Sequence, residues 1–220
     1  STIKFLKDLK KNNNKPWFDA NRKVYDTAKA DFISFIDAVI EKHGKKDPSI
    51  AHLAAKDCIF RINRDVRFSK DKSPYKSNMG AYINKDGKKG ISAGYYFHCE
   101  PGAAFGGGGL YMAPPDQLKN IRQEIDYNWK EFQKIINSKK FKAVFGDLST
   151  EGDMKLSRPP KGYEADNPAI EYLKLKSWVG MQQFSDADLT SKDLVKKVCT
   201  NFETLQPLLQ FLNEGLHAGE

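Results

Sequence analysis

Residues 90–112 read GISAGYYFHCEPGAAFGGGGLYM and contain two strand-like segments. These segments, 90–99 and 104–112, are short and rich in Tyr and Phe, which is typical of strands. Two earlier segments, Asp57–Ile62 and Gly80–Asn84, have the same character, and Asp86-Gly87 predicts a hairpin turn before residue 90. We therefore expect an antiparallel sheet, with a further strand later in the chain at 178–184.

Helices are predicted on either side of this block. Apolar residues recur at helical spacing over 2–12, from Pro16 to about Lys42, and from Pro114 to about Asn137, and shorter helices are expected at 139–146 and 168–174. Thr190 and Asp193 have the spacing of a capping box, which would open a last helix that kinks at Pro207.

The sequence therefore predicts one α+β domain over residues 1–220, with a central antiparallel β-sheet flanked by helices. Residues 1–45 are expected to be helical, 57–112 to form the β-rich core, and 115–216 to be helical and mixed. The first and last of these regions each contain a long helix, near the N-terminus and the C-terminus.

The charge of the chain is uneven along its length. Lys and Arg number 36, and Asp and Glu number 28, which gives a formal charge of +8. Residues 1–90 carry 21 basic and 11 acidic side chains, whereas residues 91–220 carry 15 and 17. A net charge of +10 in the first part predicts an anionic partner there.

Several classes of protein are excluded by what the sequence lacks. No apolar run approaches the roughly 18–20 residues of a membrane span, so no membrane partner is expected. The three cysteines are odd in number and widely separated, which fits a reducing cytoplasm and not a disulfide framework. Neither C-x-x-C nor H-E-x-x-H occurs and the four histidines form no ligand pair, so neither a metal site nor a cofactor is expected.

The densest charge lies in residues 60–76, FRINRDVRFSKDKSPYK, with six basic residues and two acids. In a strand over 57–62, Phe60 and Ile62 would face one side and Arg61 the other. Three arginines at intervals of three cannot all face the core, and Arg is suited to bidentate recognition of phosphate or carboxylate. The alternative interpretation is a solvated face of ion pairs, each contributing about 0–1 kcal/mol.

Four consecutive glycines, Gly106–Gly109, stand inside a strand-like segment, where they cost backbone entropy. They would allow close approach of the backbone to a ligand, or expose N–H groups to an anion. The alternative is a flexible bulge. No Lys-Ser/Thr pair follows them, so a nucleotide-binding P-loop is not predicted.

Residues 90–94 match G-x-S-x-G around Ser92, but a strand-like segment follows where a nucleophile elbow needs a helix. A serine hydrolase is therefore not expected. His98 and Cys99 form no dyad either, because neighbours on a strand point to opposite faces.

Two further segments place polar groups where they could border a site. On the first long helix, Trp17, Asn21 and Tyr25 share a face, and Arg22 lies beside Asn21. The alternative is simple core packing, with Asn21 as a buried and bonded amide. The segment 158–163, RPPKGY, predicts a stiff basic loop over a pocket, or else a polyproline-like surface connection.

These motifs together resemble the family of bacterial and fungal conserved hypothetical proteins known as domain of unknown function 2461. The resemblance is carried by WFxxNRxxY at 17–25, RINRDxRFSxDKxPYK at 61–76, GYY at 94–96, PG at 101–102, the glycines with Tyr111, residues 156–163 and KxKSW at 174–178. It spans nearly the whole chain and implies a single globular domain of about this length. It implies no established activity, substrate or catalytic residue.

From the residues we expect a site for a small phosphate- or carboxylate-bearing ligand, with any reaction left open. The candidate ligand-binding residues are Asn21, Arg22, Arg61, Arg64, Arg67, Lys72, Tyr75, Lys76, Tyr96, Gly107, Gly108, Tyr111, Arg158 and Lys161. The candidates for proton transfer are Asp65, Asp71 and Tyr75. The second interpretation is nucleic-acid binding by the basic face of 1–90, and the third is an interaction module without catalysis. The oligomeric state is not predicted.

Overall fold

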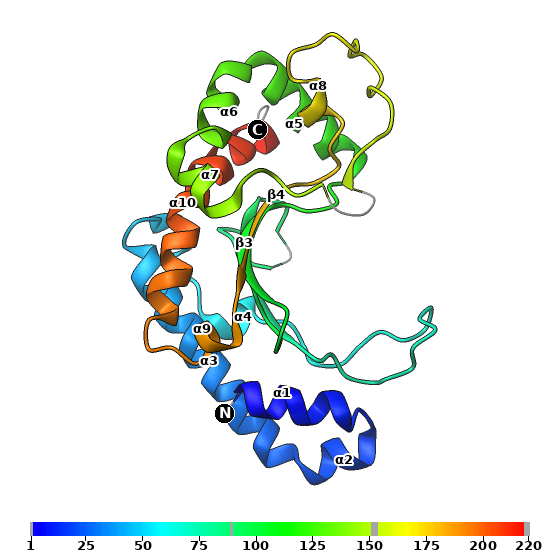
Figure 1. Ribbon diagram of the computed structural model, residues 1–220, viewed down its shortest axis with the longest axis vertical. Helices are drawn as coiled ribbons and strands as arrows, with labels where there is room; N and C mark the ends of the chain where they lie inside the picture. Colours follow the sequence, from blue (N-terminus) through cyan, green and yellow to red (C-terminus); the bar gives the residue numbers. More distant parts are fainter. Residues whose placement is uncertain (1, 89, 151–153, 218–220) are drawn as a thin grey trace.

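At the centre of the computed structural model, which describes residues 2–88, 90–150 and 154–217, is a four-stranded antiparallel sheet. Its strands lie in the order β1 (Met79–Ile83), β2 (Gly94–Cys99), β3 (Ala104–Leu110) and β4 (Trp178–Phe184) (Figure 1). A turn containing Asp86-Gly87 joins β1 to β2, as predicted, with Gly87 at a φ of 75°. The predicted α+β class with a central antiparallel sheet is confirmed.

Helices occupy most of the remaining chain. They are α1 (Thr2–Lys11), α2 (Lys15–Ala20), α3 (Arg22–Gly44), the 3-10 helix η1 (Pro48–Ile50), α4 (Ala55–Cys58), α5 (Pro115–Tyr127), α6 (Trp129–Ile136), α7 (Lys139–Phe145), α8 (Ile170–Leu173), α9 (Asp186–Leu189) and α10 (Leu194–His217). The long helices expected near both ends are α3 and α10. Among the helices of the described part of the chain, none has the length and apolar character that a membrane crossing needs.

The two faces of the sheet have different surroundings. On one face the ring of Tyr95 stacks on Phe202 of α10, and Phe97 contacts Phe35 of α3, so α3 and α10 cover this core face (Figure 1). Side chains alternate along each strand and the register pairs neighbours directly. We call the other side of the sheet the open face. It carries Gly80, Tyr82, Tyr96, His98, Phe105, Gly107, Met181 and Gln183.

The glycine run lies in the middle of β3, where it pairs with β2 on one side and β4 on the other. A Cβ atom on Gly107 would lie 2.0 Å from the carbonyl oxygen of Gly180, and one on Gly108 would lie 2.2 Å from that of Gly94. Gly108 and Gly109 also have φ values of 150° and 135°, which favour glycine. The glycines are therefore needed for close approach of three strands. The backbone of Gly107 and Gly108 is engaged in the sheet, not in a bulge or an anion-binding loop.

Replacing Gly107 by Ala should be far more damaging than an ordinary glycine substitution. We expect G107A to lower the free energy of unfolding by more than about 4 kcal/mol, because the new methyl group would collide with a neighbouring strand. The matched control is G102A, where φ is 79° but no atom lies within 4 Å, and where about 1–2 kcal/mol is expected. Urea unfolding measures both, and equal losses would contradict this explanation of the glycine run.

The prediction of a strand at Asp57–Ile62 is wrong. Asp57 and Cys58 end the short helix α4, and Ile59 makes a single antiparallel bridge to Ala81. Burial follows a spacing of three, with Ile59 and Ile62 buried and Phe60 exposed, and not the alternation of a strand. The segment therefore crosses the edge of β1 without pairing along it.

Two predicted long helices are each broken by an asparagine. Asn21 separates α2 from α3, and its side-chain amide donates to the carbonyl oxygen of Trp17 (2.9 Å). Asn128 separates α5 from α6, and its amide donates to Glu124 (2.7 Å). The Asn21 amide competes for a carbonyl of the helical ladder, whereas the Asn128 amide bonds a side chain and the Asn128 N–H keeps the Glu124 carbonyl (2.9 Å). Hydrophobic spacing alone registers neither break.

The capping box is displaced from its predicted place at Thr190 and Asp193. The Thr190 hydroxyl instead donates backward to the carbonyl oxygen of Ala187 (3.1 Å), so it is not available to cap a following helix. The capping box in the structure joins Ser185 and Asp188 at the start of α9. The last helix, α10, begins at Leu194 and continues through Pro207.

The three cysteines are free and buried in different parts of the fold. Cys58 ends α4, Cys99 ends β2, and Cys199 lies in α10. Burial raises the pKa of the Cys58 and Cys199 thiols to about 11 and that of Cys99 to about 12. All three are therefore held as neutral thiols.

His43, in the last turn of α3, is a histidine buried without a hydrogen-bond partner. It is 0% exposed, and neither ring nitrogen has a partner among the described residues. Its ring makes edge contacts with Tyr95 (centroids 4.8 Å apart) and Phe202 (5.7 Å). Burial lowers the pKa of His43, because these surroundings disfavour the charged imidazolium.

The buried His43 should make the fold sensitive to acid. In the unfolded chain its pKa is about 6.5 and in the folded chain it is lower, so below pH 6.5 the unfolded chain binds more protons. The free energy of unfolding should then fall with pH, by at most about 1.4 kcal/mol per pH unit. Urea unfolding at pH 7.5 and pH 5 should show this loss in the native protein and in the exposed-site control H52Q. It should be smaller in H43L, and the same loss in H43L would contradict the assignment.

Candidate functional site

A cavity of about 380 Å³ lies between α3, α4 and the segment 59–63 beside β1. Among the described residues, those with charge that line it are Lys29, Lys56, Arg61 and Lys88, and no described carboxylate does. Within the described ranges, none of these four side chains has a carboxylate partner within 4.0 Å. We call this site the basic cavity.

Arg61 is held at the basic cavity by its neighbours in the chain. Ile59 and Ile62 are buried on either side of it, and the backbone N–H of Phe60 donates to the carbonyl oxygen of Gly80 (3.0 Å). Lys88 closes the other side by donating to the carbonyl oxygen of Ile59 (2.8 Å). The backbone around Arg61 and the Lys88 ammonium are therefore held by backbone bonds and packing.

The positive charges around Arg61 repel one another. Burial lowers the pKa of Lys76, and the charge of Arg61 lowers it further. The Lys76 ammonium lies 5.6 Å from the centre of the Phe60 ring, which also lines the basic cavity. Lys76 therefore adds positive charge next to the basic cavity, although it is not one of its lining residues.

The two other arginines of the 60–76 segment are bonded within their own loop. Arg64 pairs with Asp71 and donates to the carbonyl oxygen of Ser73 (3.2 Å). Arg67 makes a bidentate ion pair with Asp65, in which Nε and Nη2 lie 3.0 and 2.7 Å from the two carboxylate oxygens. Neither lines the basic cavity.

The acidic partners in this loop are poorly suited to proton abstraction. Hydrogen bonds from the hydroxyl and N–H of Ser73, together with Arg64, lower the pKa of Asp71 to about 2. Hydrogen bonds from Arg67 lower the pKa of Asp65. A carboxylate this stable is a weak base near pH 7, so the geometry argues against the candidate catalytic role of either residue.

The segment around Trp17 packs against Tyr75. The Tyr75 ring is buried and stacks on Phe18, with the centroids 4.0 Å apart, and its backbone exchanges two hydrogen bonds with Asn13. Arg22 lies over the same Phe18 ring at 5.3 Å. Tyr75 and Asn21 therefore have structural partners, and Arg22 lies next to Tyr25, which lines the basic cavity.

The remaining predicted residues do not gather at the basic cavity. Lys72 donates to the carbonyl oxygen of Val66 (3.0 Å) within its own loop, and Tyr111 is exposed after the end of β3. Arg158 and Lys161 are exposed in a segment that Figure 1 places at the opposite end of the sheet from residues 61–76. Of the predicted arginines, Arg61 alone lines the basic cavity.

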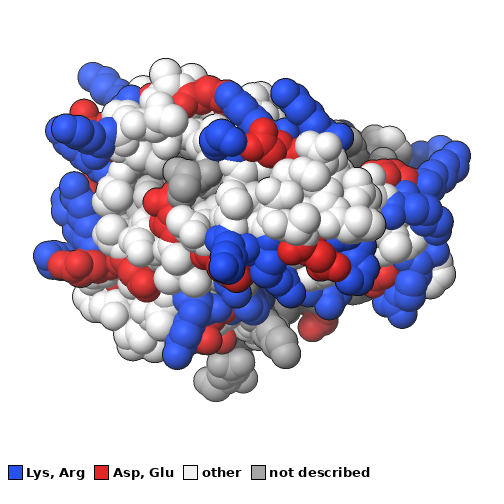
Figure 2. All heavy atoms as spheres, turned by 90° about the horizontal axis from the view of Figure 1, so that it is seen from below, with Lys and Arg blue, Asp and Glu red and all other residues white. Residues whose placement is uncertain are grey.

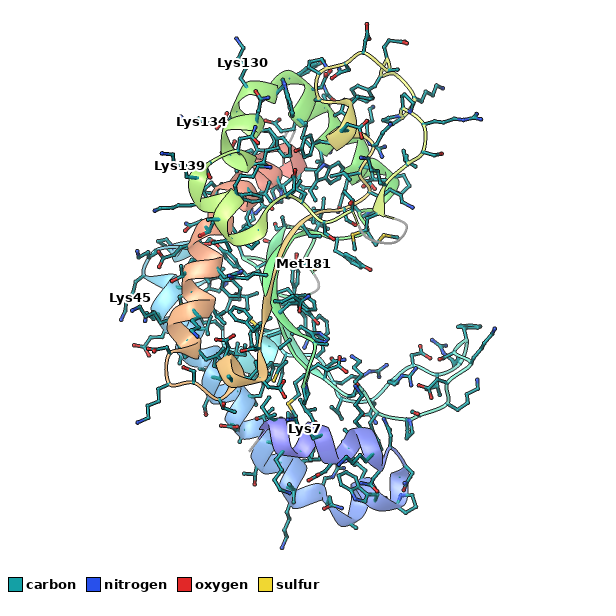
Figure 3. The ribbon with its side chains drawn as sticks, viewed as in Figure 1. Lys7, Lys45, Lys130, Lys134, Lys139 and Met181 are labelled. Atoms are coloured by element: carbon teal, nitrogen blue, oxygen red, sulfur yellow. The ribbon has the colours of Figure 1, made fainter. Side chains whose placement is uncertain are left out.

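A chain of hydrogen bonds that sequence reasoning missed runs along β2 on the open face. The hydroxyl of Tyr96 lies 3.1 Å from Nδ1 of His98, and Nε2 of His98 lies 3.1 Å from Oε2 of Glu100. The spacing of two along a predicted strand was the available signal, since it places all three residues on one face. Figure 3 labels Met181, which lies on this same side of the sheet.

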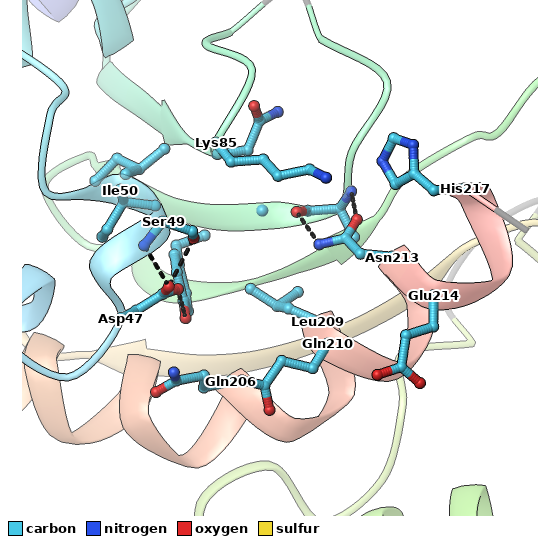
Figure 4. Close-up of a pocket in the computed structure, with 15 residues that line it drawn as sticks. Asp47, Ser49, Ile50, Lys85, Gln206, Leu209, Gln210, Asn213, Glu214 and His217 are labelled. Carbon is cyan, nitrogen blue, oxygen red and sulfur yellow. Dashed lines mark hydrogen bonds between the residues drawn. The ribbon is translucent and has the colours of Figure 1, made fainter. Parts of the chain in front are cut away.

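A second cavity, also about 380 Å³, lies between η1, the β1–β2 edge and α10 (Figure 4). Its polar groups mostly tie these elements together. Asp47 accepts a hydrogen bond from the Tyr95 hydroxyl (2.7 Å), and the side chain of Asn213 bonds both the N–H and the carbonyl of Ala93. Gln206 donates to the carbonyl oxygen of Lys46 (3.2 Å). Polar contacts at the second cavity therefore join these elements to one another, and its lining contains both acidic and basic residues.

Ser92 of the G-x-S-x-G match is also a structural residue. It is 1% exposed, bonds the carboxylate of Asp86, and lies 3.0 Å from Nε2 of His217. The Ser92 hydroxyl donates to Asp86, and β2 follows where a nucleophile elbow has a helix. The contact instead ties the end of α10 to the β1–β2 turn. His98 and Cys99 are neighbours on β2 and lie on opposite faces of the sheet.

We expect no reaction of Ser92 with a fluorophosphonate probe, because the hydroxyl is shielded from solvent and committed to Asp86. Peptide mass spectrometry after incubation checks this, with a known serine hydrolase as the positive control. A phosphonylated peptide that contains Ser92, and that is lost in S92A, would contradict the structural assignment.

Comparisons with known proteins place the chain in a family. Neither the search of curated proteins nor that of solved structures found a match. The family model described as conserved hypothetical protein (DUF2461) matches residues 1–211. The chain therefore belongs to the DUF2461 family of conserved hypothetical proteins.

Proposed function

We propose that the protein binds a small phosphate- or carboxylate-bearing ligand in the basic cavity. The observation that carries this proposal is the lining of four cations without a carboxylate, in the part of the chain that the structure describes. Charge-assisted hydrogen bonds from Arg and Lys to an oxyanion are short and strong. Arg61 would supply the planar fork, and the lysines would supply point charges.

The size and composition of the basic cavity suit a small ligand. Ligand sites commonly have volumes of about 300–1,000 Å³, and this one has about 380 Å³. Its apolar lining includes Phe32, Ile33 and the exposed ring of Phe60, and Asn63 adds a polar group. We therefore expect a ligand with one anionic group and a compact body that packs against these rings.

The arrangement of charge elsewhere favours a local anion site over a long polyanion. Figure 2 shows basic and acidic side chains side by side on the face seen from below. Several lysines of α1 and α2 are paired with carboxylates, including Lys7 with Asp186 (2.9 Å) and Lys15 with Asp19. A surface that tracks a nucleic-acid backbone would present unpaired cations in a continuous groove.

Arg61→Ala tests the proposal against a matched control, Arg67→Ala. Inorganic phosphate and a panel of phosphorylated and carboxylated metabolites are screened by thermal shift, and hits are measured by calorimetry. A ligand present at 100 times its Kd should stabilise the native protein by about 2.7 kcal/mol. R61A should weaken binding by about 10–100-fold, since a hydrogen bond to a charged group contributes about 1.5–3 kcal/mol. R67A, outside the basic cavity, should bind like the native protein.

The proposal fails if no compound stabilises the protein, or if R61A and R67A bind equally well. A single-stranded oligonucleotide in the same assay addresses the nucleic-acid interpretation. Binding of the oligonucleotide alone, with affinity falling steeply as salt rises, would favour that interpretation instead.

A further inference from the structure

We propose that Tyr96 is a nucleophile activated by His98, with Glu100 as the positioning residue, and that this site on the open face accepts esters with an apolar acyl group. The site lies on the open face of the sheet and adjoins the basic cavity at Phe60. The inference rests on the hydrogen-bond chain along β2, in which Tyr96, His98 and Glu100 project from one face at intervals of two. A nucleophile, a base and a group that orients the base are the three parts of such a site.

The direction of the hydrogen bonds follows from the charge on Glu100. Although burial opposes it, hydrogen bonds from His98 and Ser77 lower the pKa of Glu100, so this carboxylate is ionised. An ionised carboxylate only accepts, so Nε2 of His98 carries the proton toward it. In the neutral imidazole Nδ1 is then an acceptor, and the Tyr96 hydroxyl donates to it over 3.1 Å.

The groups around this chain hold it in place from three directions. The Ser77 hydroxyl donates to Oε1 of Glu100 (2.8 Å), and the Lys10 ammonium of α1 lies 3.6 Å from the same oxygen. The His98 ring stacks on Phe105, with centroids 4.8 Å apart and planes 12° from parallel. The His98 and Glu100 side chains are only 15% and 18% exposed. Such supporting contacts fix a base relative to its nucleophile.

Glycines provide the space that Tyr96 needs. A Cβ atom on Gly80 would lie 2.6 Å from the Tyr96 hydroxyl oxygen, so only glycine at this position lets the phenol lie across β1. Gly107 pairs with Tyr96 on one side and with Met181 on the other, so β3 places no side chain between them on the open face. A substrate can therefore lie along this surface beside Tyr96.

The proton of Tyr96 has a defined destination during the reaction. Burial raises the pKa of Tyr96 to about 12, so the phenol is neutral near pH 7 and needs a base when it attacks. The phenol oxygen would bond to the ester carbonyl carbon as its proton passes to Nδ1 of His98. The bond to the alcohol then breaks, and the alcohol takes that proton. Water repeats these steps on the tyrosyl ester, which releases the acid and restores Tyr96.

The surroundings of Tyr96 determine the class of acyl group. Phe105, Met181 and the exposed ring of Phe60 lie around this part of the sheet, and the Phe60 and Tyr96 ring centroids are 6.3 Å apart. The Lys10 ammonium is directed at Glu100 and not at Tyr96. An uncharged, apolar acyl group is therefore expected, in contrast to the anionic ligand of the basic cavity.

The experiment uses p-nitrophenyl butyrate and the full-length protein. Release of p-nitrophenolate is followed at pH 7.5, and acylated tyrosines are located by peptide mass spectrometry. Tyr96 should be acylated at least ~10²-fold faster than the exposed Tyr111 and Tyr127, because general base catalysis contributes about 10²–10⁴-fold. Y96F should remove the label. H98Q should slow acylation on the order of 10²-fold, whereas H52Q should not change it.

Glu100 is tested by a spectroscopic signature that a merely structural role would not move. In the native protein, ¹⁵N NMR should show His98 with its proton on Nε2. In E100Q the amide can donate to Nε2, so the proton should move to Nδ1 and acylation should slow, with rescue in E100D. The proposal is overturned if Tyr96 reacts no faster than Tyr127, if H98Q matches the native rate, or if His98 carries its proton on Nδ1. The tautomer is read from the native protein, so this outcome does not depend on the folding of a variant.

Discussion

The glycine backbone of β3 lies in close contact with the carbonyl groups of β2 and β4, and this contact holds the sheet and its last helix together. β3 is paired on both sides, and Gly107, Gly108 and Gly109 each direct a Cα hydrogen where a side chain would meet a carbonyl oxygen of β2 or β4. The same strand brings in the last helix, since Asn201 of α10 donates to the carbonyl oxygen of Gly106 (3.3 Å). A side chain in this run would separate strands and helix together.

The same close contact also explains why the two faces of the sheet differ. On the core face, aromatic rings of β2 fill the space between the sheet and the helices, as Tyr95 does against Phe202. On the open face, the absence of side chains at Gly80 and Gly107 leaves room around Tyr96. The glycines of β1 and β3 therefore allow close packing and also leave space on the surface where polar side chains meet.

Much of the fold could be predicted from the sequence, because it depends on local patterns. The strand at 178–184 and the turn at Asp86-Gly87 agree with the structure, since alternation and turn chemistry are properties of neighbouring residues. Other features depend on tertiary structure or on single side chains. Residues 57–62 make one bridge to β1 and no strand, and the Asn21 amide takes a helix carbonyl at a break across which the hydrophobic spacing continues.

The candidate site was harder to predict, because identical residue types have different partners. Arg61, Arg64 and Arg67 are equally spaced, yet Arg64 pairs with Asp71 and Arg67 with Asp65. Which arginine keeps an acidic partner depends on how the loop turns back, and this is not encoded in the spacing. Lys29 and Lys56 reach the basic cavity from α3 and α4, and nothing in their local sequence distinguishes them from other surface lysines.

The reactivity of the three buried thiols can report local unfolding of the molecule. Cys58, Cys99 and Cys199 lie in three separate elements, and burial keeps each one protonated. Only the thiolate reacts with alkylating reagents, so a thiol reacts when its element opens to solvent. The relative rates at the three positions therefore report whether the end of α4, the end of β2 and the middle of α10 open as one cooperative unit or separately.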